Sequence, residues 1–264
     1  MKIEIIVFLM TIHIPKCIGN TTTKCIEEVC VPADYNHLVR PLLNDTNLIH
    51  VDFRDLKILK VDDHESTIAI SSSIWLSWIE PRIMVTSEVP DIFPIDKTFL
   101  KLLWLPDAYI YNLQSIKQHA FIHNFDGLLL VNQTWVTYNV ELEVDIYCPM
   151  TFESYPIDTH ACYFMLGSYS YDEDILNFNL RHLEFDPRDQ VSLLDYSLKV
   201  NPLPRFKKYR YRGDMKYKRT GCEIVLERNI KKYIINYYVP SGLLVVVSWV
   251  SKKCLENLFT IEWY

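Results

Sequence analysis

Residues 136–147 (VTYNVELEVDIY) alternate without a break between apolar and polar side chains. A period of two residues is typical of a β-strand with one buried and one solvated face. Cys148 and Cys162 follow this strand directly, with thirteen residues between them. If they pair in an oxidising compartment, the closed loop stabilises the fold by roughly 3 kcal/mol, mostly by restricting the unfolded chain. The stretch therefore predicts a β-rich domain, and its cysteine spacing alone indicates no more than an ordinary secreted-domain disulfide.

The N-terminus predicts export. Residues 1–20 carry Lys2 and then an apolar run, Ile5 to Ile14, that is too short to span a membrane, so a cleaved signal peptide is expected. A buried N-terminal strand is the alternative. Export permits disulfides among the six cysteines that remain, at positions 25, 30, 148, 162, 222 and 254. Cys25 and Cys30 are close enough to pair locally, but the pairing of Cys25, Cys30 and Cys222 stays open.

Three Asn-x-Thr acceptor patterns support an extracellular, glycosylated domain. The first begins at Asn20 and touches the expected cleavage site, which leaves Asn44 and Asn132 as the candidate glycosylation sites. The net charge of −6 is spread along the chain without a basic stripe, so no nucleic-acid partner is expected.

Most of the remaining chain predicts short strands. A short helix is expected over residues 33–43, ended near Pro41, and a slip of the alternation at Asp55 indicates a β-bulge. Further strands are expected at Thr67–Ile70, Leu128–Val131, Tyr163–Leu166, Leu176–Leu180 and Ile224–Arg228, many of them separated by turn signals. This spacing of strands favours a β-sandwich.

Three ordered motifs carry a resemblance to a known family. The first is the Cys148–Cys162 loop, which opens with Cys-Pro-Met and contains Tyr155-Pro156-Ile157-Asp158. The others are Trp104-Leu-Pro-Asp107 and Trp78-Ile-Glu-Pro-Arg82, the latter with Glu where the family has Asp. Together they resemble Cys-loop pentameric ligand-gated ion channels from about residue 33 to residue 251. The resemblance implies an all-β, immunoglobulin-like twisted sandwich over residues 21–230, with a short N-terminal helix and one transmembrane helix after it.

The C-terminal region predicts that membrane helix. Residues 233–251 are mostly apolar and lie between two lysine pairs, and at 1.5 Å per residue they span roughly one hydrocarbon core. A buried core helix is the alternative. We assign residues 231–251 to the helix, with a kink at Pro240 of the kind that membrane helices tolerate. The ending Ser248-Trp-Val-Ser251 resembles the anion-selective branch. Residues 252–264 resemble no family segment, so we expect a truncated form without the family's pore helix.

The resemblance also places a ligand between neighbouring subunits, in a box of aromatic residues. The expected principal-face residues are Tyr109, Tyr111, Tyr169, Tyr171, Tyr217 and Arg219, and Trp75 is expected on the complementary face. A cationic amine over such rings gains about 0.5 to 2 kcal/mol per contact. For any single tyrosine, packing or a position on the exposed β-surface is the ordinary alternative.

Departures from the family pattern bear on the ligand. Trp75 stands where glycine- and GABA-type receptors have an Arg that binds the ligand carboxylate, so that residue's bidentate contact is lost. Gly167 replaces an acidic residue, and no cysteine between 163 and 221 could partner Cys222. We therefore predict a subunit that is not gated by ordinary amino acids. It would be a divergent invertebrate-type chloride channel subunit, an amine- or pH-responsive subunit, or an accessory subunit.

The disulfide loop has a mechanical role in the family, in which Tyr155, Pro156 and Asp158 match positions that pass movement towards the pore. The chain is thus expected to be a plasma-membrane channel subunit with an extracellular domain, a small-molecule agonist, homologous subunits in a pentamer and lipid around its helix. The alternative is a truncated ligand-binding or dominant-negative regulatory subunit. No cofactor or metal site is expected. An enzyme is disfavoured, because no nucleophile elbow, phosphate loop or metal-spaced cluster occurs, and His160 is expected to be exposed rather than catalytic.

Overall fold

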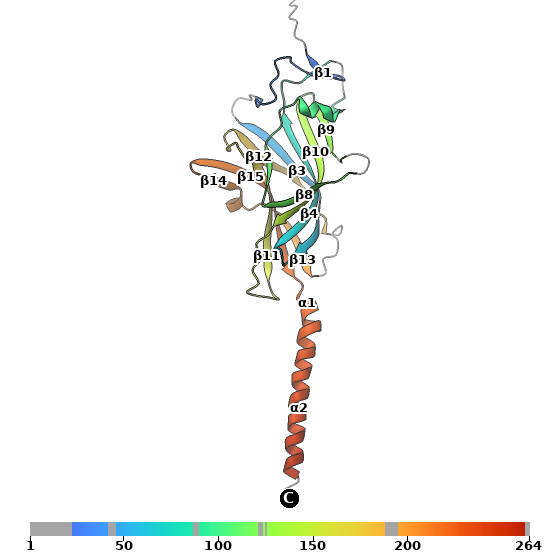
Figure 1. The fold of residues 1–264 in the computed structure, drawn as a ribbon, viewed down its shortest axis with the longest axis vertical. Coiled ribbons are helices and arrows are strands. Elements are labelled where there is room, and N and C mark those ends of the chain that lie inside the picture. The colour runs from blue at the N-terminus through green and yellow to red at the C-terminus, as the bar shows by residue number, and fades with distance from the viewer. Residues whose placement is uncertain are drawn as a thin grey trace, which may run out of the picture.

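The computed structural model describes residues 23–41, 46–86, 90–120, 124, 126–187 and 195–261. A β-domain forms one end of the molecule, and a single long helix leaves its lower end (Figure 1). The predicted signal peptide and Asn44 lie outside the described residues.

One sheet is built around three long strands. Within the described residues its order is β12-β3-β4-β10-β9-β6, and β8 also pairs with β10. Strand β10 and β4 pair antiparallel in unbroken register from Trp135↔Ile79 to Tyr147↔Thr67. The strand predicted at 136–147 is therefore confirmed, one residue longer. The strands are β3 (Asn47–Asp62), β4 (Thr67–Ile79), β6 (Ile92–Ile95), β8 (Leu113–Gln118), β9 (Asp126–Val131), β10 (Trp135–Tyr147) and β12 (Leu176–Leu183).

The second sheet packs across the first, and in the described part of the chain it has the order β13-β15-β11-β7, with β14 paired to β15. Phe53 of the first sheet meets Phe164 of the second at a ring-centroid distance of 5.1 Å, and both are fully buried. Such contacts make one apolar core between the layers, as predicted for a sandwich. The strands are β7 (Ala108–Tyr111), β11 (Thr159–Ser168), β13 (Tyr196–Pro202), β14 (Tyr209–Arg212) and β15 (Met215–Arg228).

The bulge predicted at Asp55 is confirmed. The register of β3 against β4 shifts between Arg54 and Lys57, and Asp55 has a positive φ of 50°. An extra residue of this kind increases the local twist and re-aims the side chains on either side of it. One of these is Arg54, which takes part in the site described below.

The helix predicted over residues 33–43 is wrong for its described part, because residues 33–41 form turns. The apolar side chains of this segment do not pack against the core, because Leu38 is 75% exposed and Val39 is 46% exposed. Pro41 also disfavours a helical conformation in the residue before it. The segment is instead held by side chains, since the hydroxyl of Tyr35 donates to Glu80 over 2.9 Å.

Small elements complete the domain at its N-terminal end. The strands β1 (Lys24–Ile26), β2 (Val29–Val31) and β5 (Met84–Val85) form a three-stranded sheet in the described residues. Cys25 and Cys30 face each other across the β1–β2 turn and form a disulfide, which settles their pairing.

In the described residues, two short 3₁₀ helices also lie in the loops of the domain, η1 (Lys97–Lys101) and η3 (Arg205–Lys207).

The C-terminal rod consists of α1 (Ile230–Tyr233), a π-helical turn η4 (Ile234–Tyr238) and α2 (Val239–Ile261). The helix α2 continues through Pro240, where the sequence predicts a kink, and a π-helical turn ends two residues before this proline. The hydroxyl of Ser241 donates to the carbonyl of Tyr237 over 2.7 Å. In the described residues one helix, Ile230–Cys254, is long and apolar enough to cross a membrane, and no residue of its most apolar window is buried. The helix continues beyond the expected boundary at residue 251.

Candidate ligand-binding faces and the base of the domain

Three predicted loops meet on one side of the sandwich, which we call the principal face (Tyr109, Tyr111, Tyr169, Tyr217 and the arginines around them). The strands β7, β11 and β15 lie side by side, so that Gly167 pairs with Tyr109 on one side and Arg219 on the other. The ring of Tyr109 lies 5.1 Å from Tyr111 and 5.4 Å from Tyr169. The structure therefore brings together Tyr109, Tyr111, Tyr169 and Tyr217, but not Tyr171, of the tyrosines that the sequence singled out.

Asp107 of the Trp-Leu-Pro-Asp motif fixes this arrangement. Its Oδ2 accepts a hydrogen bond from the backbone N–H of Ser170 over 2.8 Å. The loop before β7 and the loop after β11 are thus joined next to the tyrosine cluster.

The tyrosines do not have equal access to a ligand. Tyr109 and Tyr169 are exposed, whereas Tyr111 and Tyr217 are buried. The hydroxyl of Tyr111 donates to the carbonyl of Ser168 over 3.0 Å, and burial raises its pKa, although nearby arginines act in the opposite direction. Tyr171 is partly buried against the core, apart from the cluster. The rings that can meet a ligand are therefore Tyr109 and Tyr169.

The chain's own arginines already lie over the rings of Tyr111 and Tyr169. The guanidinium of Arg212 lies 5.6 Å from the ring of Tyr169, and those of Arg210 and Arg219 lie 5.7 and 5.4 Å from the ring of Tyr111. These are cation–π distances. Sequence reasoning named Arg219 but missed Arg210 and Arg212, whose alternation with tyrosines in the run YRYR was the available signal.

The other side of the sandwich carries a cavity of about 420 Å³, which we call the complementary-face pocket. Trp75, which the sequence predicts on the complementary face, forms part of its wall. The guanidinium of Arg54 stacks 4.0 Å above the Trp75 ring, from the neighbouring strand β3. The pocket is lined by His50, Arg54, Trp75, Ser77, Ile92, Leu129, Val131, Asn132, Trp135, Thr137 and Arg181.

This pocket has an excess of positive charge. Arg181 binds the buried carboxylate of Asp52 through two hydrogen bonds of 2.9 and 2.5 Å. Arg54 lies farther from the same carboxylate, at 3.6 Å, so two guanidinium groups share one carboxylate. Burial, and then the charge of Arg181, lowers the pKa of His50, although the charge of Asp52 acts in the opposite direction.

Two polar atoms in the wall of this pocket lack partners. In the described part of the chain, Arg54 Nε and His50 Nδ1 are buried and make no hydrogen bond. Unpaired buried polar groups are costly and mark places where a ligand or water completes the site. Sequence reasoning missed Arg54, His50 and Arg181, because their proximity depends on cross-strand pairing and on the bulge at Asp55.

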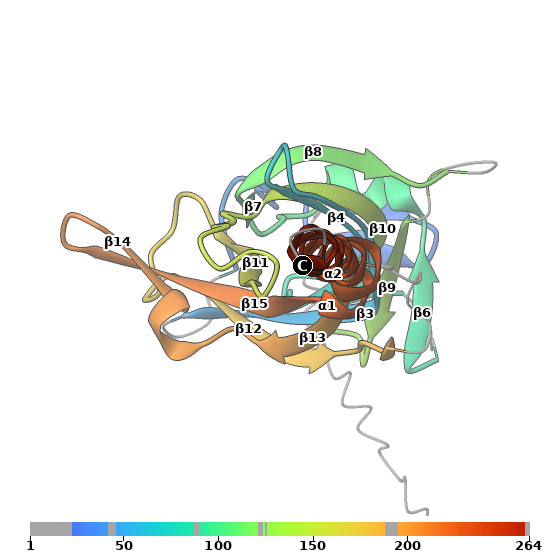
Figure 2. The same cartoon turned by 90° about the horizontal axis from the view of Figure 1, so that it is seen from below.

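The two faces lie on opposite sides of the domain. Seen from below, the β14–β15 hairpin projects at one side, while β6 and β9, which line the pocket, lie at the other (Figure 2). Copies arranged head to tail in a ring would therefore bring the principal face of one against the complementary face of the next.

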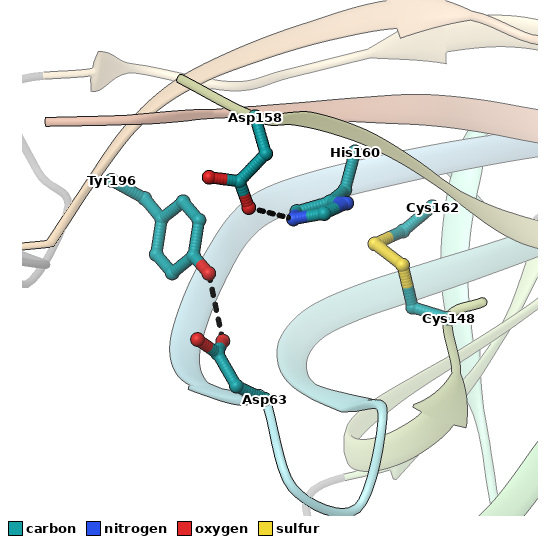
Figure 3. Close-up of a disulfide and its surroundings, with 6 residues drawn as sticks. All are labelled: Asp63, Cys148, Asp158, His160, Cys162 and Tyr196. Atoms are coloured by element: carbon teal, nitrogen blue, oxygen red, sulfur yellow. Dashed lines mark hydrogen bonds and ion pairs between the residues drawn. A yellow bond between two sulfur atoms is a disulfide. The ribbon is translucent and has the colours of Figure 1, made fainter. Parts of the chain in front are cut away.

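The lower end of the domain holds the predicted disulfide loop. Cys148 and Cys162 are joined in a disulfide, and both are fully buried. Beside them Asp158 binds the His160 ring over 2.6 Å, and Tyr196 donates to Asp63 over 2.7 Å (Figure 3). The expectation that His160 is exposed is wrong, because its side chain is held by Asp158 and packed beside Phe152, at 5.3 Å between ring centroids.

The disulfide loop touches the start of the C-terminal helix. The ring of Tyr155 lies 5.3 Å from that of Tyr233 in α1, with the two planes nearly perpendicular. Tyr155 is exposed, whereas Pro156 and Asp158 are buried. Of the three predicted coupling residues, Tyr155 therefore contacts the helix, and Asp158 binds Arg228 at the end of β15.

Cys222 is a buried free cysteine, and burial raises the pKa of its thiol to about 12. Because the described residues leave it unpaired, no disulfide closes the capping hairpin of β14 and β15.

Comparison with known proteins agrees with this architecture. The family described as neurotransmitter-gated ion-channel ligand binding domain matches residues 23–230. The glycine receptor subunit beta of Rattus norvegicus is 27% identical over 193 residues, which are 71% of this chain and 39% of the receptor subunit. The gamma-aminobutyric acid receptor subunit pi of Rattus norvegicus is 28% identical over 229 residues, or 83% of this chain and 50% of that subunit.

The chain therefore spans half or less of the length of these relatives. The match covers both faces, the disulfide loop and the strands that carry them. This chain belongs to the neurotransmitter-gated ion-channel ligand-binding domain family, within the Cys-loop receptors that resemble glycine and GABA receptor subunits.

Proposed function

We propose that the chain is a subunit of a pentameric, anion-selective, ligand-gated channel at the plasma membrane. A small ligand would bind between the principal face of one subunit and the complementary-face pocket of the next. The observation that carries this proposal is the pairing of an aromatic, arginine-rich face with a cavity on the opposite side of the same domain. A volume of about 420 Å³ lies in the range of small-molecule sites.

The charges favour a ligand with a carboxylate or similar anionic group. On the principal face, Arg210, Arg212 and Arg219 already face the tyrosine rings, so a cationic amine would meet like charges. In the pocket, Arg54 and Arg181 outnumber the single carboxylate of Asp52. Trp75 stands where an arginine was expected, and the guanidinium of Arg54, from the next strand, lies 4.0 Å from the centre of the Trp75 ring. Charge-assisted hydrogen bonds of this kind are among the stronger ones in proteins.

The signal would leave the site through the lower end of the domain. Strand β15 carries Tyr217 and Arg219 near the ligand and ends at Arg228, which binds Asp158 of the disulfide loop. The helix α1 begins two residues later and contacts Tyr155. Movement of the capping hairpin would therefore reach the helix along one strand.

The alternative function is a ligand-binding or regulatory subunit that joins other subunits and alters their currents. Both candidate faces lie within the residues that the family model matches, so this second candidate needs only the described domain.

A chimera tests the first proposal. Residues 1–230 are joined to the transmembrane region of a glycine-gated chloride channel, and currents are recorded while small carboxylates, amino acids and amines are applied. We expect a chloride current with small carboxylates that carry no amine, because an amine would meet the arginines of the principal face. A chimera that reaches the cell surface and responds only to amines contradicts the proposed ligand class.

Co-expression separates the two candidates. The chain is expressed with an intact glycine- or GABA-type sibling, and surface protein is measured alongside current. Loss or alteration of the sibling's current favours the regulatory subunit, and an unchanged current despite surface expression argues against it.

A further inference from the structure

One glycosylation pattern lies on the complementary-face pocket itself. Asn132, Gln133 and Thr134 form the turn between β9 and β10, and all three are exposed. Asn132 and Gln133 have positive φ angles of 48° and 61°, a conformation that asparagine tolerates better than most residues. The sequence Asn-Gln-Thr is an acceptor pattern, and an exposed turn is open to the glycosylating enzyme.

Asn132 also lines the pocket, between its neighbours Val131 and Trp135 in the wall. The Trp135 ring packs at 5.4 Å from that of His50, so the turn is continuous with the inner wall of the cavity. The side chain that would carry the first sugar therefore stands at the rim of the space that contains Arg54 and Trp75.

The turn is held in place. The backbone N–H of Asn132 donates to the carbonyl of Asp91 over 2.8 Å, and the N–H of Glu80 donates to the carbonyl of Thr134 over the same distance. A sugar chain on Asn132 would thus start from a fixed point rather than from a loop that can swing away.

We propose that an N-linked glycan on Asn132 stands across the mouth of the complementary-face pocket and limits the size of the molecules that reach it. A glycan is bulky and solvated. It would leave the pocket open to a small anion and shield it from larger molecules. The effect of this glycan on ligand binding rests on the proposed function, whereas its presence and its effect on access to the pocket do not.

The test measures access to the pocket without any agonist. A cysteine replaces Leu129, a pocket residue of β9, in the full chain made by secretory-pathway cells. The background carries Cys254→Ser, because Cys254 is an exposed free cysteine among the described residues, whereas Cys222 is fully buried. The protein without an added cysteine serves as the blank. The reagents are N-ethylmaleimide and a maleimide with a long polyethylene glycol chain.

Two sets of controls identify the glycan at Asn132 as the cause. Asn132→Gln and Thr134→Ala each remove this acceptor pattern, and Asn44→Gln removes the other one. Asp214→Cys provides an exposed reference site at the β14–β15 turn. Glycopeptide mass spectrometry determines whether Asn132 is occupied.

We expect Asn132 to carry a glycan, and the long reagent to modify Leu129→Cys several-fold more slowly than in either variant lacking the Asn132 pattern. N-ethylmaleimide should react with Leu129→Cys at similar rates in all of these proteins. Asn44→Gln should not change the rate of the long reagent at Leu129→Cys. Loss of the Asn132 pattern should not change its rate at the Asp214→Cys reference site. An unoccupied Asn132, or equal rates of the long reagent with and without the glycan, overturns the proposal. Because no ligand is used, the result is independent of whether the chimera described above is gated.

Discussion

Arg228 at the end of β15 binds Asp158 of the disulfide loop through two hydrogen bonds, from Nε to Oδ1 over 2.7 Å and from Nη2 to Oδ2 over 3.0 Å. Both side chains are only 2% exposed. The same guanidinium reaches Asp63, in the turn between β3 and β4, over 3.0 Å. One arginine therefore joins the two sheets and the disulfide loop directly above the helix.

Breaking this ion pair is expected to be costly. Arg228→Gln leaves Asp158 charged and buried, so the free energy of unfolding should fall by about 3–5 kcal/mol. Replacing both residues with apolar ones, Arg228→Met with Asp158→Leu, should cost less than Arg228→Gln alone. Denaturant unfolding of the detergent-solubilised chain measures both.

Lys199→Gln provides the matched control, because it removes an ion pair with Glu227 that is largely exposed, on strands of the same sheet. Its effect should be at most about 1 kcal/mol. Equal losses in the Arg228 and Lys199 variants would contradict the structural importance of the buried pair.

Acidification should weaken the domain through Asp158. Burial acts to raise the pKa of this carboxyl, but the hydrogen bonds from Arg228 and His160 outweigh burial and hold the pKa below its usual range. A group whose pKa is lower in the folded state stabilises the protein above its unfolded pKa, and that contribution is lost as the pH falls through the folded value. The loss is therefore expected below about pH 4.

Thermal unfolding measured from pH 7 down to pH 3 checks this prediction. Asp158→Asn should have a lower midpoint at neutral pH and should lose less stability than the original chain over the acidic part of the range. Parallel curves for the two proteins would show that Asp158 does not contribute to the acid sensitivity.

Gly167 is expected to resist substitution. A Cβ at this position would lie 2.7 Å from the carbonyl oxygen of Lys218 and 3.4 Å from the ring of Tyr111. Gly167→Glu should therefore push β15 away from β11 and disturb the principal face. We expect reduced surface expression and a lower unfolding midpoint.

Gly213→Ala, in the turn between β14 and β15, is a control for glycine replacement, because nothing lies within 4 Å of the added carbon. Its positive φ of 59° still makes alanine mildly unfavourable. A Gly167→Glu protein as stable as the Gly213→Ala protein would argue against the close approach of the two strands.

Arg54 is expected to bind the anionic group of the ligand. In the chimera, Arg54→Gln removes a charge-assisted contact of about 1.5–3 kcal/mol, so the half-maximal concentration of a carboxylate ligand should rise roughly 10- to 100-fold. Lys60→Gln, on the same strand but outside the pocket, removes the same charge and should leave this concentration unchanged. Equal effects of the two changes would indicate a general electrostatic influence rather than a contact.

Much of the fold followed from local pattern. The alternation at residues 136–147 reports which face of β10 is buried, and this depends only on a period of two. The bulge at Asp55 was predicted from a break in the same kind of alternation, in the segment that forms β3. The helix predicted at 33–43 failed for the complementary reason, since apolar spacing predicts a helix only where a core exists to cover it, and Leu38 faces solvent.

The sequence by itself determined several of the strands, the disulfide loop, the long apolar helix and, through its ordered motifs, the family. Only the tertiary structure decided the charges at the site and the burial of His160. Arg54, Arg181 and Asp52 come from two strands more than a hundred residues apart in sequence, and they meet because β12 pairs in parallel with β3. Contacts between distant strands depend on sheet order and register, which no local pattern encodes.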